Sequence, residues 1–315
     1  MRALITGIAG FVGAHLAEAI LAETDWEVWG AVIGSVERAS AISGVRNLTT
    51  DLREPEQARV LVETAQPDWV FHLAAQAYVP QSWADPWDTY QTNIRSQLNL
   101  LDAISRLGLQ PRILIVSSNE VYGYARPEDL PLNENAPLRP NSPYSVSKLA
   151  QDFMGLQYFL DRQMSIIRVR PFNHIGPRQD ERFVAPSFAK QIVEIERGQR
   201  EPVLLLGNMA AQRDFTDVRD MVRAHILAIQ RGEPGEVYNI GTGTARSVRE
   251  MLDIMLAHTP IRIAEEIDPA KIRPSDTPIS YADPSKFRRR TGWEPRISFQ
   301  QTCVDILSDW RTRIP

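Results

Sequence analysis

The sequence predicts a doubly wound α/β fold, in which a parallel sheet carries helices on both faces and a smaller α/β lobe is attached. Three observations predict it. Short runs rich in Val, Ile and Leu alternate with amphipathic stretches through the first half of the chain, an order typical of βαβ units. The first of these runs leads directly into three closely spaced glycines. After about residue 171, proline becomes more frequent and the strand patterns become less regular.

The individual elements follow from these patterns. Strands are predicted over residues 2–6, 27–32, 69–73, 112–117 and 165–170, and helices over residues 13–23, 55–66, 87–106 and 142–160. In the second half, residues 214–218 are strand-like, residues 219–231 are helical, and Ser247 with Glu250 has the spacing of a helix-capping box. We expect a dinucleotide-binding domain over residues 1–171 and mainly a substrate-binding lobe over residues 172–315, with some segments returning to the first domain.

Composition argues against several classes of protein. The 315 residues carry a formal net charge of −4, so no basic field attracts nucleic acid. No apolar run approaches the roughly 20 residues that a membrane-spanning helix needs. Cys303 is the single cysteine, which excludes an intrachain disulfide and is typical of a reducing compartment. We expect it to be buried on a helix over residues 298–311. We also expect a cytoplasmic location, because the chain begins directly with a strand pattern, and we expect no metal site.

A glycine pattern follows the first predicted strand. Gly7, Gly10 and Gly13 have the spacing G-x-x-G-x-x-G, after a strand and before a helix. In a dinucleotide-binding fold, the first glycine makes the tight turn, the second lets the backbone approach a pyrophosphate, and the third lets the helix pack closely on the strand. The pyrophosphate then rests on the helix N-terminus, where unpaired N–H groups favour an anion. We therefore expect NAD or NADP as cofactor.

The end of the second predicted strand does not decide between these two cofactors. An acidic residue there typically binds the adenosine ribose of NAD, and an arginine typically meets the 2′-phosphate of NADP. Residues 28–35 contain neither. Arg38, a few residues later, could reach a 2′-phosphate or could simply lie in a solvated loop.

Tyr144 and Lys148 begin a second constellation. They are four residues apart in a predicted helix and therefore share one face. A phenol has an ordinary pKa of about 10 and needs help to exchange protons near neutrality, and a nearby ammonium supplies it by favouring the phenolate. The strand predicted over residues 112–117 ends at Ser117 and Ser118, at the edge where ligands bind in such sheets. A serine hydroxyl there can hydrogen-bond a sugar oxygen, or can simply cap the strand end.

Together, five stretches of the chain resemble the extended short-chain dehydrogenases that modify nucleotide sugars. They are the glycine set, Asp51-Leu52, His72-Leu73-Ala74-Ala75, residues 118–123 and residues 144–148, and the resemblance covers nearly the whole chain. It implies a catalytic trio of Ser118, Tyr144 and Lys148, in which Tyr144 exchanges the proton and Lys148 also holds the nicotinamide ribose. It implies that Asp51 and Leu52 lie beside the adenine. The other residues that it places against the cofactor are Phe11, Val12, Leu73, Ala74, Ala75 and Pro171.

Motifs in the second half narrow the resemblance. Residues 170–178, 188–192, 213–220 and 273–276 look like those of GDP-4-keto-6-deoxy-D-mannose reductases and their GDP-mannose 4,6-dehydratase relatives. This resemblance implies a GDP-linked sugar as substrate. Guanidinium groups suit its diphosphate because they form charge-assisted, often bidentate bonds to phosphate oxygens. The resemblance implies that the diphosphate is held by Asn173, Arg213 and Arg273, that Lys190 lies near the guanine, and that Asp276 binds the ribose.

The reaction is open between related chemistries. In a reductase, hydride goes to the C4 ketone while Tyr144 protonates the developing alkoxide and Ser118 stabilises it. In a dehydratase, C4 is first oxidised and a base, for which Glu120 is placed, removes the proton at C5. Asn119 stands where dTDP-glucose dehydratases carry an acid, which argues against that relative. Residues 173–179 look closer to the reductases, so we favour reduction of GDP-4-keto-6-deoxy-D-mannose to a GDP-6-deoxyhexose such as GDP-D-rhamnose.

Three alternatives stay open. The first is a GDP-mannose 4,6-dehydratase and the second is a nucleotide-sugar 4-epimerase. A non-catalytic dinucleotide-binding protein is a different class, against which the intact catalytic trio argues. Relatives of this group dimerise through a four-helix bundle. The helices predicted over residues 87–106 and 142–160 would supply that bundle, so we expect a homodimer.

Overall fold

The computed structural model describes residues 1–34, 42–271 and 277–315. Within this part of the chain, a seven-stranded parallel sheet has the order β11-β6-β5-β4-β1-β2-β3. The order reverses between β1 and β4, and ligands bind above the carboxyl ends of the strands at such a reversal. The strands are β1 (Arg2–Thr6), β2 (Glu27–Val32), β3 (Val45–Thr49), β4 (Trp69–His72), β5 (Arg112–Val116), β6 (Ile166–Pro171) and β11 (Val237–Ile240).

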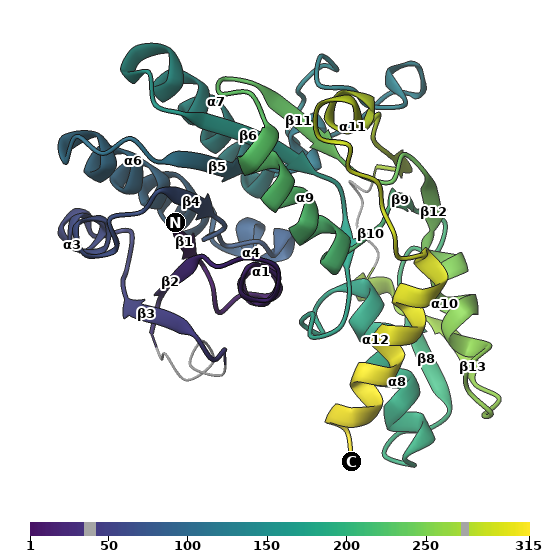
Figure 1. The fold of residues 1–315 in the computed structure, drawn as a ribbon. Coiled ribbons are helices and arrows are strands. Elements are labelled where there is room, and N and C mark those ends of the chain that lie inside the picture. The colour runs from purple at the N-terminus through teal and green to yellow at the C-terminus, as the bar shows by residue number, and fades with distance from the viewer. Residues whose placement is uncertain (35–41, 272–276) are drawn as a thin grey trace.

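Helices cover both faces of the sheet, as Figure 1 shows. Each buries one apolar side: Leu16 and Ile20 of α1 join one core, and Leu100 and Ile104 of α6 join the other. The i, i+4 spacing of these pairs is the pattern from which the sequence predicts helices. One face carries α1 (Phe11–Glu23), α9 (Val218–Arg231) and α11 (Ser285–Thr291), and the other carries α3 (Pro55–Ala65), α6 (Ser96–Arg106) and α7 (Pro143–Arg162).

The helix predicted over residues 87–106 is interrupted. It divides into α5 (Pro86–Tyr90), a π turn labelled η1 (Gln91–Arg95), and α6. Asn93 of this turn is fully buried. Its Oδ1 accepts from the backbone N–H of Gln76 at 2.7 Å, and its Nδ2 donates to the Gln76 carbonyl at 3.1 Å. A π turn adds one residue to a helical turn and often occurs near functional sites, and the hydrophobic periodicity gives no sign of it.

A smaller lobe has its own apolar core, at the lower right of Figure 1. Cys303 lies fully buried in this core on α12, as the sequence predicts, and burial raises the pKa of its thiol to about 12. The main elements of the lobe are the helices α8 (Val184–Glu196), α10 (Val248–Leu256) and α12 (Phe299–Arg313), together with the parallel strands β8 (Val203–Leu206) and β13 (Ala264–Ile267).

Short strands and the buried Asp214 hold the junction of the two lobes. The carboxylate of Asp214 accepts backbone N–H groups of Thr242, Gly243 and Ala282 at 2.8, 2.9 and 3.2 Å. These bonds join three distant segments at one point. The small sheets pair β7 (His174–Ile175) with β10 (Thr216–Asp217), and β9 (Gln212–Asp214) with β12 (Ala245–Ser247) and β14 (Ile279–Ser280). The remaining short helices of the described chain are α4 (Val79–Ala84), η2 (Asn119–Tyr122), η3 (Pro127–Asp129) and η4 (Pro269–Lys271).

The doubly wound fold predicted from the sequence is confirmed, with the five predicted strands reproduced to within one residue at either end. Segments from beyond residue 171 return to the large sheet as α9, β11 and α11. The capping box predicted at Ser247 is only half formed. Ser247 Oγ accepts the Glu250 N–H at 3.0 Å, but the Glu250 carboxylate accepts from Arg246 instead.

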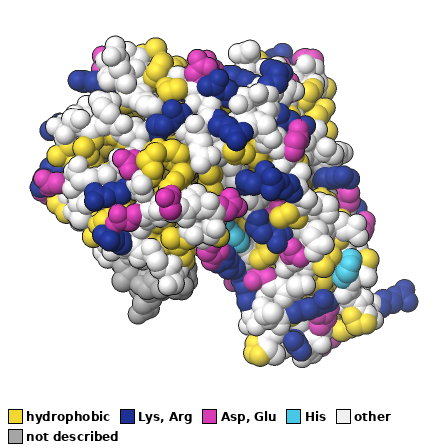
Figure 2. Space-filling model, viewed as in Figure 1, with side chains coloured by type: hydrophobic (Ala, Val, Ile, Leu, Met, Phe, Trp, Pro, Cys, Tyr) yellow, Lys and Arg dark blue, Asp and Glu magenta, His cyan; other side chains and the backbone are white. Residues whose placement is uncertain are grey.

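The surface carries charges of both signs. On the face drawn in Figure 2, acidic and basic side chains are interspersed over both lobes. No helix in the described part of the chain combines the length and the apolar character that crossing a membrane requires.

Candidate active site

The turn after β1 is built from glycines that other residues could not replace. Gly7 has a φ of +72°, and a Cβ on it would lie 2.9 Å from the Cα of Ala74. A Cβ on Gly13 would lie 2.3 Å from the carbonyl oxygen of Gly7. The first glycine therefore allows the turn to touch the segment after β4, and the last allows α1 to pack on the turn.

The N-terminus of α1 faces the carboxyl edge of the sheet and has the character of an anion site. Gly10 is its N-cap, and the described chain places no side-chain cap and no acidic residue in its first turn, which begins with Phe11 and Val12. A Cβ on Gly10 would meet only the Gly7 carbonyl, at 3.1 Å, so the backbone is open to a close ligand. Unpaired N–H groups and the helix dipole favour a pyrophosphate here. The residues present fit the predicted cofactor.

The predicted adenine contacts lie at the next strand ends. Both carboxylate oxygens of Asp51 accept from Arg53, at 3.0 Å from Nε and 2.8 Å from Nη2, and this pairing lowers the pKa of Asp51. Leu52 is buried, and its carbonyl accepts from Asn99 at 2.8 Å. Leu73, Ala74 and Ala75 directly follow β4, with Ala74 against the glycine turn. Arg38 lies outside the described residues.

The catalytic trio predicted from the sequence gathers at the end of β5. Ser118 follows β5 by two residues and is the N-cap of η2, where its Oγ accepts the N–H of Glu120 at 3.2 Å. The side chain of Ser118 lies close enough to Tyr144 to lower the pKa of its phenol. Lys148 Nζ donates to the carbonyl of Val116, the last residue of β5, at 2.9 Å. One serine and two residues of α7 therefore share one edge of the sheet.

The start of α7 sets the direction of the catalytic side chains. Pro143 occupies the first helical turn, and Ser142 and Ser145 cap it reciprocally: Ser142 Oγ accepts the N–H of Ser145 at 3.1 Å, and Ser145 Oγ accepts the N–H of Ser142 at 2.9 Å. This cap fixes the first turn, where Tyr144 lies. Tyr144 and Lys148, one turn apart, are only 8% and 4% exposed.

Burial dominates the electrostatics of the site. It raises the pKa of the Tyr144 phenol well above its ordinary range, the neighbouring Ser118 side chain opposes this shift, and the nearby charge of Glu120 adds to it. The structure differs here from the sequence-based expectation that Lys148 lowers the pKa of Tyr144. Burial also lowers the pKa of Lys148, to about 7, so each group is shifted toward its neutral form.

The predicted substrate residues that the structure describes lie on three different segments of the chain, and one of them is engaged in ion pairs. Asn173 lies two residues after β6, and its Oδ1 is buried without a hydrogen-bond partner in the described structure, which suits a ligand that donates to it. Arg213 lies in β9, with Nη1 donating to the Gln212 carbonyl at 2.9 Å. Lys190 on α8 pairs with Glu181 at 2.5 Å and with Glu194 at 3.7 Å. A guanine contact would have to compete with these carboxylates.

Two of the predicted substrate residues, Arg273 and Asp276, lie outside the described residues. Pro171, predicted to line the cofactor groove, is the last residue of β6 and is buried at the same sheet edge. The expected contacts of these residues stay predictions.

Sequence reasoning assigned no role to His72, although it quoted the stretch that contains it. The ring is buried, and burial lowers its pKa to about 3. Nδ1 lies 2.9 Å from Thr6 Oγ1, and Nε2 lies 3.3 Å from Gln151 Nε2. Thr6 Oγ1 also accepts the N–H of Ala74 at 3.1 Å. A neutral imidazole on β4 thus joins Thr6 of β1 to Gln151 of α7.

A buried ion network behind the trio also went unpredicted. Asp152 on α7 is fully buried and pairs with Arg168 at 2.7 Å and with Arg170 at 2.6 Å, both on β6. The signal in the sequence was two arginines alternating with apolar residues within a predicted strand. The network ties α7 to the sheet two turns after Tyr144.

The sheet order, the glycine turn and the Ser/Tyr/Lys trio define an enzyme of the extended short-chain dehydrogenase type. The family model described as GDP-mannose 4,6 dehydratase matches residues 4–306. The chain belongs to this family.

Relatives agree with the resemblance seen in the sequence. The GDP-6-deoxy-D-mannose reductase of Pseudomonas aeruginosa is 35% identical over 99% of this chain and 98% of the relative. The structure of RMD from Pseudomonas aeruginosa complexed with NADPH covers all of both chains at 34% identity and a TM-score of 0.88. The UDP-glucose 4-epimerase of Thermus thermophilus, in complex with NAD, also covers all of both chains, at 30% identity and a TM-score of 0.86.

Proposed function

We propose that the protein is an NAD(P)H-dependent reductase of the C4 ketone of GDP-4-keto-6-deoxy-D-mannose, forming a GDP-6-deoxyhexose such as GDP-D-rhamnose. The observation that carries the proposal is the gathering of Ser118, Tyr144 and Lys148, all buried, at the end of β5 on the sheet edge that also carries the glycine turn. The similarity of the whole chain to a GDP-6-deoxy-D-mannose reductase supports the choice of reaction. Similar structures hold NADPH or NAD, and both cofactors remain in the proposal.

The trio suits the reducing direction. The bound cofactor supplies a hydride to C4, and the ketone oxygen must then gain a proton. Tyr144 donates that proton, and Ser118 donates a hydrogen bond to the same oxygen as its charge develops. Tyr144 must arrive protonated for this step, and its burial raises its pKa and keeps it so. Lys148, at the end of β5, would hold the nicotinamide ribose.

The other end of the substrate is assigned to the junction between the lobes. We propose that Asn173 and Arg213 hold the diphosphate together with Arg273, that Asp276 binds the ribose, and that Lys190 lies near the guanine. The unpaired Oδ1 of Asn173 supports a ligand hydroxyl or N–H that donates at this point, since buried carbonyl oxygens rarely lack a donor, and its Nδ2 is the group that can donate to the diphosphate.

The experiment mixes purified protein with GDP-4-keto-6-deoxy-D-mannose and either NADH or NADPH, and follows the absorbance of the reduced cofactor. We expect rapid oxidation, with the faster cofactor showing the preference. Tyr144→Phe removes the proton donor and should slow turnover by roughly 100-fold or more while leaving cofactor binding intact. Absence of oxidation by the wild-type protein with both cofactors would overturn the assignment.

GDP-mannose 4,6-dehydratase activity is a second candidate, favoured by one observation. Glu120 lies close enough to Tyr144 to influence its pKa, and a carboxylate near the reacting sugar is what proton removal at C5 needs. In that case GDP-mannose would lose water with no net consumption of cofactor, and Glu120→Gln would abolish the reaction. Glu120→Gln should leave the reductase reaction largely unaffected.

We also propose a homodimer formed through α6 and α7. Apolar side chains stand out from these helices: Leu98 is 44% exposed, Phe153 48% and Leu160 67%. Exposed apolar groups along neighbouring helices are typical of a protein–protein interface. A cytoplasmic location belongs to the same proposal, supported by the single, unpaired cysteine.

A further inference from the structure

The cofactor-binding helix touches the substrate lobe through an aromatic contact. Phe11, the first residue of α1, stacks on His174 with ring centroids 6.3 Å apart and lies edge-on to His15 at 5.5 Å. The loop after His174 passes close by, because a Cβ on Gly176 would lie 2.6 Å from Val218 and 3.7 Å from the Phe11 ring. The turn that receives the pyrophosphate and the loop that begins at Asn173 therefore pack directly on each other.

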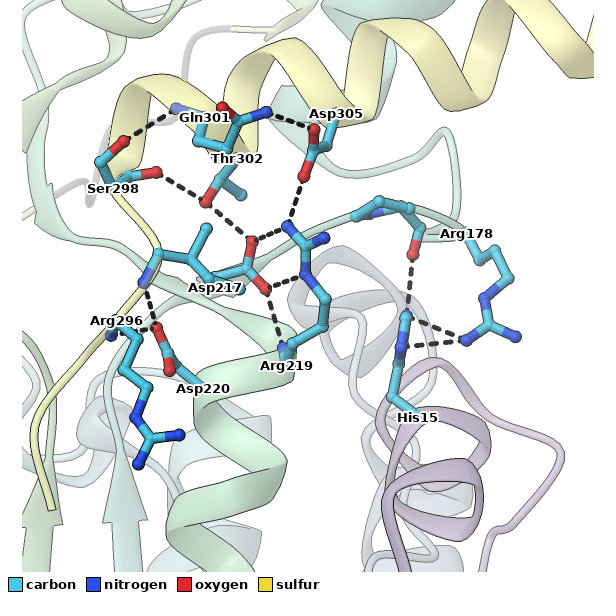
Figure 3. A network of polar contacts seen from close by, with 12 residues as sticks. His15, Arg178, Asp217, Arg219, Asp220, Arg296, Ser298, Gln301, Thr302 and Asp305 are labelled. Carbon is cyan, nitrogen blue, oxygen red and sulfur yellow. Dashed lines mark hydrogen bonds and ion pairs between the residues drawn. The ribbon is translucent and has the colours of Figure 1, made fainter. Parts of the chain in front are cut away.

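Hydrogen bonds fix the ring of His15 at this contact, as Figure 3 shows. The carbonyl of Pro177 lies 3.0 Å from Nε2, and Nη2 of Arg178 lies 2.9 Å from Nδ1. A carbonyl can only accept, so Nε2 carries the hydrogen that bonds to Pro177, while the Arg178 Nη2 lies beside the ring, within 3.4 Å of Nε2 as well. Burial, with the nearby Arg178 charge, lowers the pKa of His15 and favours the neutral ring, which contacts the substrate lobe through both Pro177 and Arg178.

Arg178 extends the joint to two helices. Its guanidinium donates to both carboxylate oxygens of Glu18 on α1, at 2.6 Å each, and its backbone N–H donates to Asp309 on α12 at 2.8 Å. Its φ of +70° is unusual for a residue with a side chain. These contacts hold the strained backbone and bring α1, the loop and α12 to one point.

The joint continues into the start of α9. Asp217, the N-cap of α9, accepts from the backbone N–H and the guanidinium of Arg219 and, at 2.8 Å, from Thr302 of α12. Arg219 also donates to Asp305 of α12. These bonds connect α9 firmly to α12 of the smaller lobe. His15, on α1, lies where α1 meets the loop in front of that lobe.

We propose that His15 is a positioning residue, which locks the loop over residues 173–178 to the cofactor-binding turn so that cofactor binding orders the substrate side of the site. The proposal rests on the proposed function, because that function gives Asn173 its place beside the substrate. His15 is not among the residues assigned to the cofactor or to the substrate. It acts through the Pro177 carbonyl and the Arg178 guanidinium.

The primary test is hydrogen exchange, followed by mass spectrometry, with and without NADPH. In the wild-type protein, we expect NADPH to slow exchange in residues 173–180 by about tenfold or more, together with the glycine turn. His15→Phe keeps the ring volume but removes both hydrogen bonds. It should lose the protection of residues 173–180 while the glycine turn stays protected. His15→Gln can still donate to the Pro177 carbonyl and should retain the effect.

Kinetics supply a second readout. His15→Phe should lower kcat for the GDP-sugar by about 10- to 100-fold, since small displacements of a bound reactant have effects of that size, with the KM for NADPH within about twofold. His15→Gln should recover most of the loss. His258→Phe is the matched control, because His258 is exposed and its ring bonds to Ile254 in its own helix end, and it should behave as wild type.

The outcomes separate this proposal from the proposed function. Protection that is unchanged in His15→Phe, lost equally in His15→Gln, or absent from the wild-type protein would overturn the positioning role. Failure to reduce the GDP-sugar, combined with the expected exchange pattern, would instead overturn only the reaction assigned to the site.

Discussion

At the scale of single residues, burial acts in the same sense on Tyr144 and Lys148: it favours the neutral form of each. The phenol is held protonated, and the lysine has a pKa of about 7 instead of its ordinary 10.5. The protonated phenol is the form that the proposed reduction needs, whereas an oxidation that begins at the sugar C4 would need the phenolate.

The depressed pKa of Lys148 predicts how stability depends on pH. Between about pH 7 and 10.5, the unfolded chain holds a proton on this lysine that the folded chain has released. The free energy of unfolding should therefore rise with pH through that window, by roughly 1.4 kcal/mol for each unit of real pKa shift. Urea titrations of the cofactor-free protein measure it. In Lys148→Met this contribution should be missing, and an identical slope in that variant would contradict the prediction.

The roles of some residues can be predicted from the sequence, and the roles of others cannot. Tyr144 and Lys148 are visible because their partnership is local, four positions apart in one helix. His15 is invisible because its partner carbonyl, on Pro177, lies 162 positions away, and no local pattern reports such a contact. The direction of the Tyr144 pKa shift was equally hidden, since burial is a property of the folded environment.

At the scale of elements, the glycine turn and α1 form one unit, in which Gly13 and Gly10 have different structural roles. Gly13 is needed for packing, because a Cβ there would meet the Gly7 carbonyl at 2.3 Å. Gly10 is needed for access, because a Cβ there would meet only that carbonyl, at 3.1 Å, and otherwise project into the space left for the ligand.

This difference predicts opposite effects of two alanine substitutions. Gly13→Ala should lower the free energy of unfolding by about 1–3 kcal/mol through overpacking. Gly10→Ala should change stability by only about 1 kcal/mol or less but weaken NADPH binding clearly. Thermal unfolding and a fluorescence titration with NADPH measure the two effects. Equal losses of stability in both variants would contradict this division.

Elements with strong apolar periodicity were predicted to within a residue or two, and weaker ones were missed. β3 has the pattern VRNLT and lies at the edge of the sheet, with every residue at least partly exposed, so it lacks the apolar run of the central strands. The π turn around Asn93 was missed because the buried residues of this stretch, Thr89, Asn93 and Gln97, are polar and give no apolar period, and because the turn is fixed by a bond to the distant Gln76.

At the scale of the whole molecule, the exposed apolar side of α6 and α7 predicts an assembly. Leu160→Glu places a charge on that side and should convert a dimer to a monomer, as measured by size-exclusion chromatography with light scattering. Ile267→Glu is the matched control, because Ile267 is an exposed apolar residue on β13 of the smaller lobe, away from α6 and α7. A wild-type protein that elutes as a monomer would refute the homodimer.

The single cysteine of the chain makes the unfolding of one lobe open to chemical labelling. Cys303, the one thiol of the chain, is sealed in the core of the smaller lobe. A thiol-reactive dye in excess would therefore label Cys303 only when the smaller lobe opens. The labelling rate then measures the rate of that opening, and it can be compared with and without cofactor. For the same reason, a cysteine introduced on the surface would accept a single fluorophore without removal of the native one.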